Sequence, residues 1–126
     1  MGAMRILVVD DHEDSAQAVA MLLRRLGHEV TVAGSVSGAL SHAAAGNVPD
    51  LLVCDITLPD GDGCALLARL CSSLGGRALP AIAITGHGRE WEERCRAAGY
   101  CRMLTKPVDF AAVLEAVATI APPAAD

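Results

Sequence analysis

Five residues with complementary chemistry each follow a short apolar run along the chain: Asp10, Asp11, Asp55, Thr85 and Lys106. Clustered carboxylates suit a hard divalent cation such as Mg²⁺, which takes oxygen ligands and leaves positions open for phosphate oxygens. A lysine would add a fixed positive charge, a threonine a hydroxyl donor, and one carboxylate a nucleophile. Brought together by folding, these groups would form a phosphoryl-transfer site, where catalysis is mainly positioning and charge neutralisation.

The apolar runs themselves predict β-strands. Three are continuously apolar, which is typical of strands covered by helices on both faces: 6–9, 51–54 and 81–84. Two are mixed, which is typical of strands at the edge of a sheet: 30–32 and 101–105. We therefore expect the continuously apolar strands at the centre of one sheet and the mixed strands at its rims.

Helical spacing of apolar residues predicts helices between the strands. The clearest stripes are Ala16, Val19, Ala20, Leu23 and Leu26, then Phe110, Val113, Leu114, Val117 and Ile120. Because glycine accepts the left-handed conformation that closes a helix, helix ends are expected at Gly27, Gly46, Gly75, Gly76 and Gly99. Asp109 is a predicted N-cap of the last helix, and Asp60 and Asp62 are expected to act in turns or caps.

Strict alternation of strands and helices predicts right-handed βαβ units and a parallel sheet with helices on both sides. The edge and centre assignments favour a doubly wound (βα)5 fold of the flavodoxin-like type, with strand order 2-1-3-4-5. In such a sheet the carboxyl ends of the strands share one rim, so the five polar residues should meet there. Each like-charge pair would cost about 4 kcal/mol at about 4 Å and a dielectric constant of about 20, so a cation must compensate.

Composition excludes several classes of function. The 126 residues suffice for one domain, and 52% hydrophobic against 20% charged residues indicates a packed core rather than disorder. A net charge of −5 and 2% aromatic residues provide neither a basic surface nor stacking platforms for direct nucleic-acid binding. No apolar run approaches the roughly 20 residues that cross a bilayer, and no signal peptide is recognisable, so we expect a cytoplasmic domain without membrane contact.

The five cysteines are Cys54, Cys64, Cys71, Cys95 and Cys101. Their odd number and the lack of a C-x-x-C pair argue against a disulfide framework and a zinc knuckle. We expect reduced thiols that serve as small core residues.

The two ends of the chain are expected to lie outside the fold. Residues 1–3 resemble a remnant of an expression vector, and the Pro-Pro segment at 122–126 is typical of a linker or tail. The predicted domain therefore spans residues 4–121.

Four segments carry a resemblance to a known family. They are Val8-Val9-Asp10-Asp11-His12-Glu13-Asp14, Asp55-Ile56-Thr57-Leu58-Pro59-Asp60-Gly61-Asp62-Gly63, Ile84-Thr85-Gly86 and Lys106-Pro107. With these motifs in this order, the chain resembles the response-regulator receiver domain of two-component signalling, of the chemotaxis-regulator type, over about residues 4 to 121.

The resemblance implies a phosphorelay module that catalyses its own aspartyl phosphorylation and dephosphorylation and is not a metabolic enzyme. Asp55 resembles the phosphoacceptor, supplied by a sensor histidine kinase or a histidine phosphotransfer domain. The implied Mg²⁺ ligands are Asp11, Asp55, the backbone carbonyl of Thr57 and, through water, Asp10. Thr85 and Lys106 resemble the pair that contacts the phosphate. Several motifs are also similar to receivers attached to hybrid sensor histidine kinases.

The family further implies a cis peptide before Pro107 and an aromatic residue on the last strand that moves with the threonine. Aligned backward from Lys106, Met103 occupies that position, and Tyr100 does not. In the family, this movement repacks the face formed by the fourth helix, fifth strand and fifth helix, where an effector or a second copy can bind. We therefore expect phosphorylation to be retained and its coupling to that face to differ.

Three further residues have two interpretations each. His12 and His87 either border the pocket or are simply solvated loop residues. Trp91 shares helical spacing with Cys95 and Ala98, which favours packing on the sheet over an exposed anchor for a partner.

Other classes of function remain open. A Mg²⁺-dependent phosphatase of the dehalogenase type also uses an aspartyl nucleophile, but its second carboxylate would fall at the position of Thr57. A degenerate receiver could act only as an interaction scaffold, although the complete acidic set argues against this. A flavin-binding module of similar topology would need a phosphate loop after the first strand, and the chain has none.

Overall fold

The computed structural model describes residues 3–86 and 89–120. Its main sheet consists of β1 (Arg5–Val9), β2 (Glu29–Ala33), β3 (Leu51–Asp55), β6 (Ala81–Thr85) and β7 (Arg102–Thr105). The strands are all parallel and lie in the order β2-β1-β3-β6-β7. In chain order of the main strands this is 2-1-3-4-5, so the predicted topology is confirmed. Every residue of β3 and β6 is buried, whereas the edge strands β2 and β7 are partly exposed.

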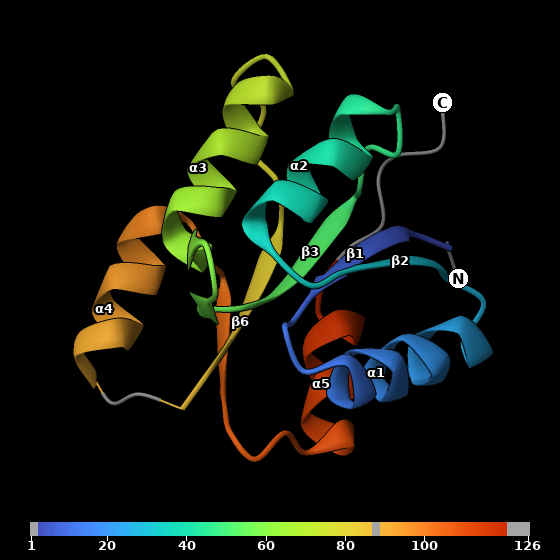
Figure 1. Ribbon diagram of the computed structural model, residues 1–126. Helices are drawn as coiled ribbons and strands as arrows, with labels where there is room; N and C mark the ends of the chain where they lie inside the picture. Colours follow the sequence, from blue (N-terminus) through green and yellow to red (C-terminus); the bar gives the residue numbers. More distant parts are fainter. Residues whose placement is uncertain (1–2, 87–88, 121–126) are drawn as a thin grey trace.

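Helices cover both faces of the sheet, as Figure 1 shows. On one face lie α1 (Glu13–Arg25) and α5 (Phe110–Ala118), and on the other lie α2 (Val36–Ala44), α3 (Gly63–Ser73) and α4 (Arg89–Ala98). Neither these helices nor any other in the described part of the chain is long and apolar enough to cross a membrane.

Successive residues of the central strands point to opposite faces and so build two cores. The α2–α4 core contains Leu7, Val9, Leu52, Cys54, Leu66, Leu67, Leu70, Ala83, Cys95 and Tyr100, among others. The α1–α5 core contains Ile6, Val8, Ala16, Val19, Leu23, Val53, Ile82, Ile84, Val113 and Val117, among others. Burial on both faces fixes the register of β1, β3 and β6, because a slip of one residue would exchange the two sets of side chains.

The predicted helix ends are largely as expected. Gly27, Gly46, Gly75, Gly76 and Gly99 all have positive φ. Asp109 caps α5, with its carboxylate accepting a hydrogen bond from Ala111 N at 2.9 Å, and Asp62 caps α3 through Ala65 N at 2.9 Å. Some of the predictions concern residues that the structure does not describe. These residues are His87, positions 1–2 of the vector-like segment, and positions 121–126, which include the last predicted domain residue and the tail.

Three predictions of burial are wrong. Leu26 is 53% exposed because α1 ends at Arg25, so the helical periodicity no longer directs its side chain to the sheet. Phe110 is 48% exposed because it is the first residue of α5, where it lines a hollow beside the sheet rim. Cys101 is exposed just before the edge strand β7, where its thiol donates to the Ala81 carbonyl at 3.2 Å.

A short hairpin that the sequence did not predict follows β3. It pairs β4 (Thr57–Leu58) with β5 (Gly61–Asp62) in antiparallel fashion. At its turn, the Asp60 carboxylate accepts hydrogen bonds from the first amides of α2, Val36 N at 2.8 Å and Ser37 N at 3.0 Å. The Ser37 and Val36 amides hold the pKa of Asp60 below its usual value. The expected capping role of Asp60 is therefore confirmed, but for a helix that precedes it in the chain.

Helix α4 packs on the sheet as its spacing predicts. Cys95 is buried, and Trp91 and Ala98 are half-buried against the α2–α4 core. The Arg94 guanidinium lies 4.2 Å from the centroid of the Trp91 ring, within the range of a cation–π interaction. The tryptophan is thus part of the packed face rather than an isolated exposed anchor.

Tyr100 ties the start of β7 to the start of α3. Its side chain is buried, and its hydroxyl donates to the Gly63 carbonyl at 2.8 Å. The close packing at this point requires glycine: a Cβ added at Gly63 would lie 3.1 Å from the Tyr100 hydroxyl, 2.9 Å from Ile56 Cδ1 and 3.0 Å from Cys54 Sγ.

We predict that Tyr100→Phe destabilises the fold by about 1 kcal/mol, because it removes the buried hydrogen bond from the hydroxyl to the Gly63 carbonyl. Urea unfolding monitored by circular dichroism measures the change. Ser73→Ala is the matched control, since it removes a hydroxyl that donates to the Leu70 carbonyl from an exposed position. We expect this variant to lose less than about 0.5 kcal/mol. Equal losses in the two variants would contradict the role assigned to the buried hydroxyl.

Candidate functional site

The carboxyl ends of the parallel strands bring the predicted polar residues to one rim of the sheet. Asp10 directly follows β1, and Asp55 ends the neighbouring strand β3. Thr85 ends β6, and Lys106 follows β7, with its backbone amide donating to the Thr85 carbonyl at 2.9 Å. The register pairs Val9 with Cys54, Asp55 with Ile84, and Thr85 with Thr105, so these strand ends are level with one another.

Three carboxylates and one imidazole converge at this rim. Ligand atoms of Asp10, Asp11, His12 and Asp55 all lie within 4.8 Å of one another. Asp10 and Asp55 are buried, with 6% and 2% exposure, whereas Asp11 is exposed to solvent. The cluster therefore has a buried base and an open side through which an ion or a phosphate can enter.

Lys106 contacts the most buried of these carboxylates. Its ammonium donates to Asp55 Oδ2 at 2.5 Å, while Asp55 Oδ1 accepts from the Thr57 amide at 3.0 Å. Partial burial works to lower the pKa of Lys106, but the hydrogen bond and charge of Asp55 outweigh it and the pKa is raised. The lysine is therefore held in its charged form beside the carboxylate. The peptide between Lys106 and Pro107 is cis, as the family implies.

The site remains electrostatically negative. Burial raises the pKa of Asp10, and the nearby Asp55 charge adds to this, while the backbone hydrogen bond from His12 N at 2.9 Å opposes it. When ionised, the three carboxylates face a single ammonium, which leaves two negative charges in a partly buried place. A divalent cation would neutralise this excess, and carboxylate oxygens are the donors that Mg²⁺ prefers. The residues present thus fit the predicted Mg²⁺ site.

Two further predicted contributors lie close to this rim. Thr85 is 1% exposed at the end of β6, between the strands that carry Asp55 and Lys106. Thr57 lies in β4, two residues after Asp55, and is exposed. The Thr57 carbonyl as a metal ligand and the Thr85 hydroxyl as a phosphate contact stay predictions.

A hollow of about 460 Å³ adjoins the acidic cluster. No motif in the sequence predicts this hollow. It is bounded by Asp10, His12, Lys106, Pro107 and Phe110, together with residues from the first turns of α1. The only hint in the sequence is Phe110, an apolar residue placed at the first position of α5 shortly after Lys106-Pro107. There its side chain is 48% exposed and lines the hollow.

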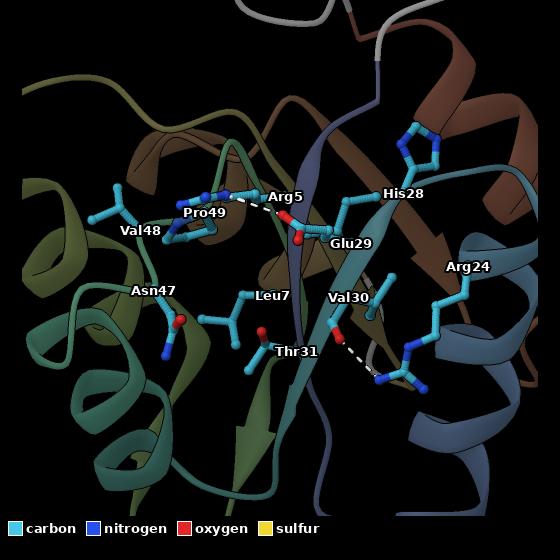
Figure 2. A pocket seen from close by; sticks show the side chains of 11 residues that line it. Arg5, Leu7, Arg24, His28, Glu29, Val30, Thr31, Asn47, Val48 and Pro49 are labelled. Atoms are coloured by element: carbon cyan, nitrogen blue, oxygen red, sulfur yellow. Dashed lines mark hydrogen bonds and ion pairs between the residues drawn. The ribbon is translucent and has the colours of Figure 1, made fainter.

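A second hollow, of about 450 Å³, lies at the opposite end of the sheet. Figure 2 shows that its charged side chains are engaged with neighbouring groups. Arg5 Nε donates to Glu29 Oε2 at 3.2 Å, and Arg24 donates to the Val30 carbonyl at 2.8 Å. His28 Nδ1 accepts from the Met4 amide at 3.0 Å. This hollow contains none of the predicted site residues.

Comparisons with known proteins agree with this geometry. The family model for the response regulator receiver domain matches residues 6–118. A receiver domain protein of the CheY-like type from Methanospirillum hungatei has a crystal structure with a TM-score of 0.82 and 28% identity, covering 94% of this chain and 93% of that one.

Two curated relatives extend the comparison. An uncharacterized 14.6 kDa protein of Leptolyngbya boryana, from the sodA1 3′ region, is 41% identical over 111 residues, which cover 86% of this chain and 83% of that protein. The sensor histidine kinase RcsC of Salmonella typhi is 32% identical over 119 residues, covering 94% of this chain but only 12% of the kinase. With a family model that matches most of its length and a sheet that carries the acidic cluster at the expected rim, the chain belongs to the response regulator receiver domain family.

Proposed function

We propose that this receiver domain accepts a phosphoryl group on Asp55 from a phosphohistidine and relays the signal through a change in its surface. One observation carries the proposal: the buried Asp55 carboxylate contacts the Lys106 ammonium while lying in one cluster with Asp10 and Asp11. A nucleophile, a fixed positive charge and oxygen ligands for a divalent cation are the parts that phosphoryl transfer needs.

In the transfer step, a carboxylate oxygen of Asp55 attacks the phosphorus in line with the leaving nitrogen. The bond from phosphorus to the donor imidazole breaks, and the imidazole leaves as a neutral ring when its other nitrogen carries a proton. Lys106 keeps its own proton and compensates the charge that spreads over the phosphoryl oxygens. The Thr85 hydroxyl, at the end of the adjacent strand, would donate to one of those oxygens.

Mg²⁺ would be held by Asp11, Asp55 and the Thr57 carbonyl, with Asp10 acting through water. When bound, it neutralises phosphoryl charge and orients the oxygens. The Asp11 side chain stands at the open edge of the cluster, while Asp10 and Asp55 lie at its buried base. An entering phosphoryl group would therefore reach Asp55 from the solvent side.

The donor would be a sensor histidine kinase or a histidine phosphotransfer domain, and the domain would work in the cytoplasm. RcsC, whose receiver-like part resembles this chain, is itself named a sensor histidine kinase. The readout would lie on α4, β7 and α5, where an effector or a second copy could bind. We place the functional domain at residues 4–121 and the linker-like tail at 122–126.

Two other functions are less well supported. A phosphatase of the dehalogenase type would need a second carboxylate two residues after the nucleophile, and this position is Thr57. A scaffold without phosphorylation would not need a charged lysine against a buried carboxylate.

We predict that Asp55→Asn abolishes phosphorylation. With acetyl phosphate and Mg²⁺, the unaltered protein should gain the mass of one phosphoryl group, labile to hydroxylamine, and the variant should not. Asp14→Asn is the matched control, because Asp14 is an exposed carboxylate on the first turn of α1 outside the acidic cluster. Phosphorylation of the D55N variant, or an equal loss of phosphorylation in D14N, would refute the assignment.

We predict that Mg²⁺ stabilises the folded protein through the acidic cluster. At about 100 times the dissociation constant, the ion should add about 2.7 kcal/mol to the free energy of unfolding. Asp11→Asn should lose most of this gain, since it removes an exposed ligand without disturbing the core. Urea unfolding with and without MgCl₂ measures the difference, and Glu13→Gln, which alters an exposed carboxylate nearby, should behave like the unaltered protein. An equal Mg²⁺ effect in all three proteins would place the ion elsewhere.

A further inference from the structure

His12 belongs to the acidic cluster by position. Its Nδ1 lies 3.3 Å from Asp10 Oδ1 and 3.3 Å from Asp11 Oδ1, and it shares the 4.8 Å grouping with Asp55. The residue stands at the N-cap of α1, but its side chain makes no capping hydrogen bond to that helix. The ring is therefore directed toward the carboxylates and not toward the helix amides.

The spacing of these atoms is close to that of ligands around one ion. Neighbouring ligands of an octahedral ion with bonds of about 2.1 Å lie about 3.0 Å apart. The separation of 3.3 Å between Nδ1 and Oδ1 of the direct ligand Asp11 therefore needs to shorten by only a few tenths of an ångström. The side chain of His12 is 69% exposed, so no packed neighbour opposes this adjustment.

The backbone holds the ring near this place. The His12 amide donates to Asp10 Oδ1 at 2.9 Å, and the His12 carbonyl accepts from Ala16 N at 3.0 Å in the first turn of α1. The residue is thus anchored through both of its backbone polar groups while its side chain faces solvent and the cluster. Without an ion, Nδ1 lies at hydrogen-bond distance from Asp10 Oδ1, 3.3 Å, where the carboxylate accepts and Nδ1 carries the proton. An ion bound in the cluster would take the place of that proton at Nδ1, and the proton of the neutral ring would then be on Nε2.

We propose that His12 Nδ1 is an additional ligand at this metal site, so that the site binds first-row divalent transition ions such as Mn²⁺ and Co²⁺ in preference to Mg²⁺. The inference rests on the proposed function for the location of the ion and adds a nitrogen donor to its ligands. Imidazole nitrogen suits transition ions, whereas Mg²⁺ favours oxygen and dehydrates reluctantly. With a carboxylate and an imidazole from the consecutive residues Asp11 and His12, the segment just before α1 would supply the selectivity.

Two measurements on the purified protein test the proposal. The first is pulsed electron paramagnetic resonance of bound Mn²⁺, in which coupling to a ¹⁴N nucleus reports a directly bound imidazole. The second is calorimetric titration with Co²⁺ and Mg²⁺. The variants are His12→Gln, which keeps a polar side chain of similar reach, and His42→Gln, a control in α2 outside the cluster.

We expect ¹⁴N coupling in the unaltered protein and in H42Q and its loss in H12Q. The Co²⁺ affinity of H12Q should fall at least about tenfold, as for the loss of a group that supports a metal site. Its Mg²⁺ affinity should change less than about twofold, since the oxygen donors remain. Circular dichroism should show the same fold in all three proteins.

Two results would overturn the proposal while leaving the phosphoacceptor function intact. One is Mn²⁺ bound without ¹⁴N coupling, and the other is a Co²⁺ preference that is unchanged in H12Q, both with normal Mg²⁺-dependent phosphorylation of Asp55. If neither Mg²⁺ nor Mn²⁺ binds and Asp55 is not phosphorylated, the proposed function itself fails, and the ligand role of His12 fails with it.

Discussion

The contact between the Lys106 ammonium and the buried Asp55 carboxylate is the interaction on which the rest of the site depends. Asp55 is 2% exposed and lies beside two more carboxylates, so the negative charges gathered there need a positive charge close by. Lys106 is contributed by a segment 51 residues further along the chain and reaches Asp55 only because β7 lies next to β6 in the sheet. Removing the lysine would leave the charge of the buried carboxylate uncompensated.

The fold meets this demand by burying apolar side chains along the strands and leaving the strand ends polar. β3 is buried along its whole length, so Asp55 is carried into the interior by the apolar residues before it. The two cores hold β1, β3 and β6 in fixed register, which in turn fixes the distances among the strand ends. The excess of negative charge at the rim is therefore imposed by the sheet, and an incoming cation would be attracted to a site that already exists.

The sequence predicts the structure well where one physical rule dominates. Continuous apolar runs identify the central strands, and their parallel order places Asp10, Asp55 and Lys106 at one rim.

Prediction from the sequence fails where the position of a residue in the folded structure decides its environment. Phe110 and Leu26 continue an apolar stripe, but a helix end turns each away from the sheet. The β4–β5 hairpin is missed because strands of two residues have no periodicity to detect. Likewise, the His12 ring faces two carboxylates through a choice of side-chain rotamer that no sequence pattern specifies.

The environment of the last strand bears on how a signal could leave the site. Tyr100 is held in the interior by its hydrogen bond to Gly63, so its ring is tied to the start of α3 and not to the acidic rim.

Met103 pairs with Ala83 in the register of β6 and β7, and it packs half-buried against the α2–α4 core. Trp91 and Ala98 of α4 pack against this same core. Met103 and these α4 residues thus share one core, and the flexible thioether lacks the directional hydrogen bond that a phenol would make. Apolar packing around this residue therefore provides no fixed polar link between the last strand and α4.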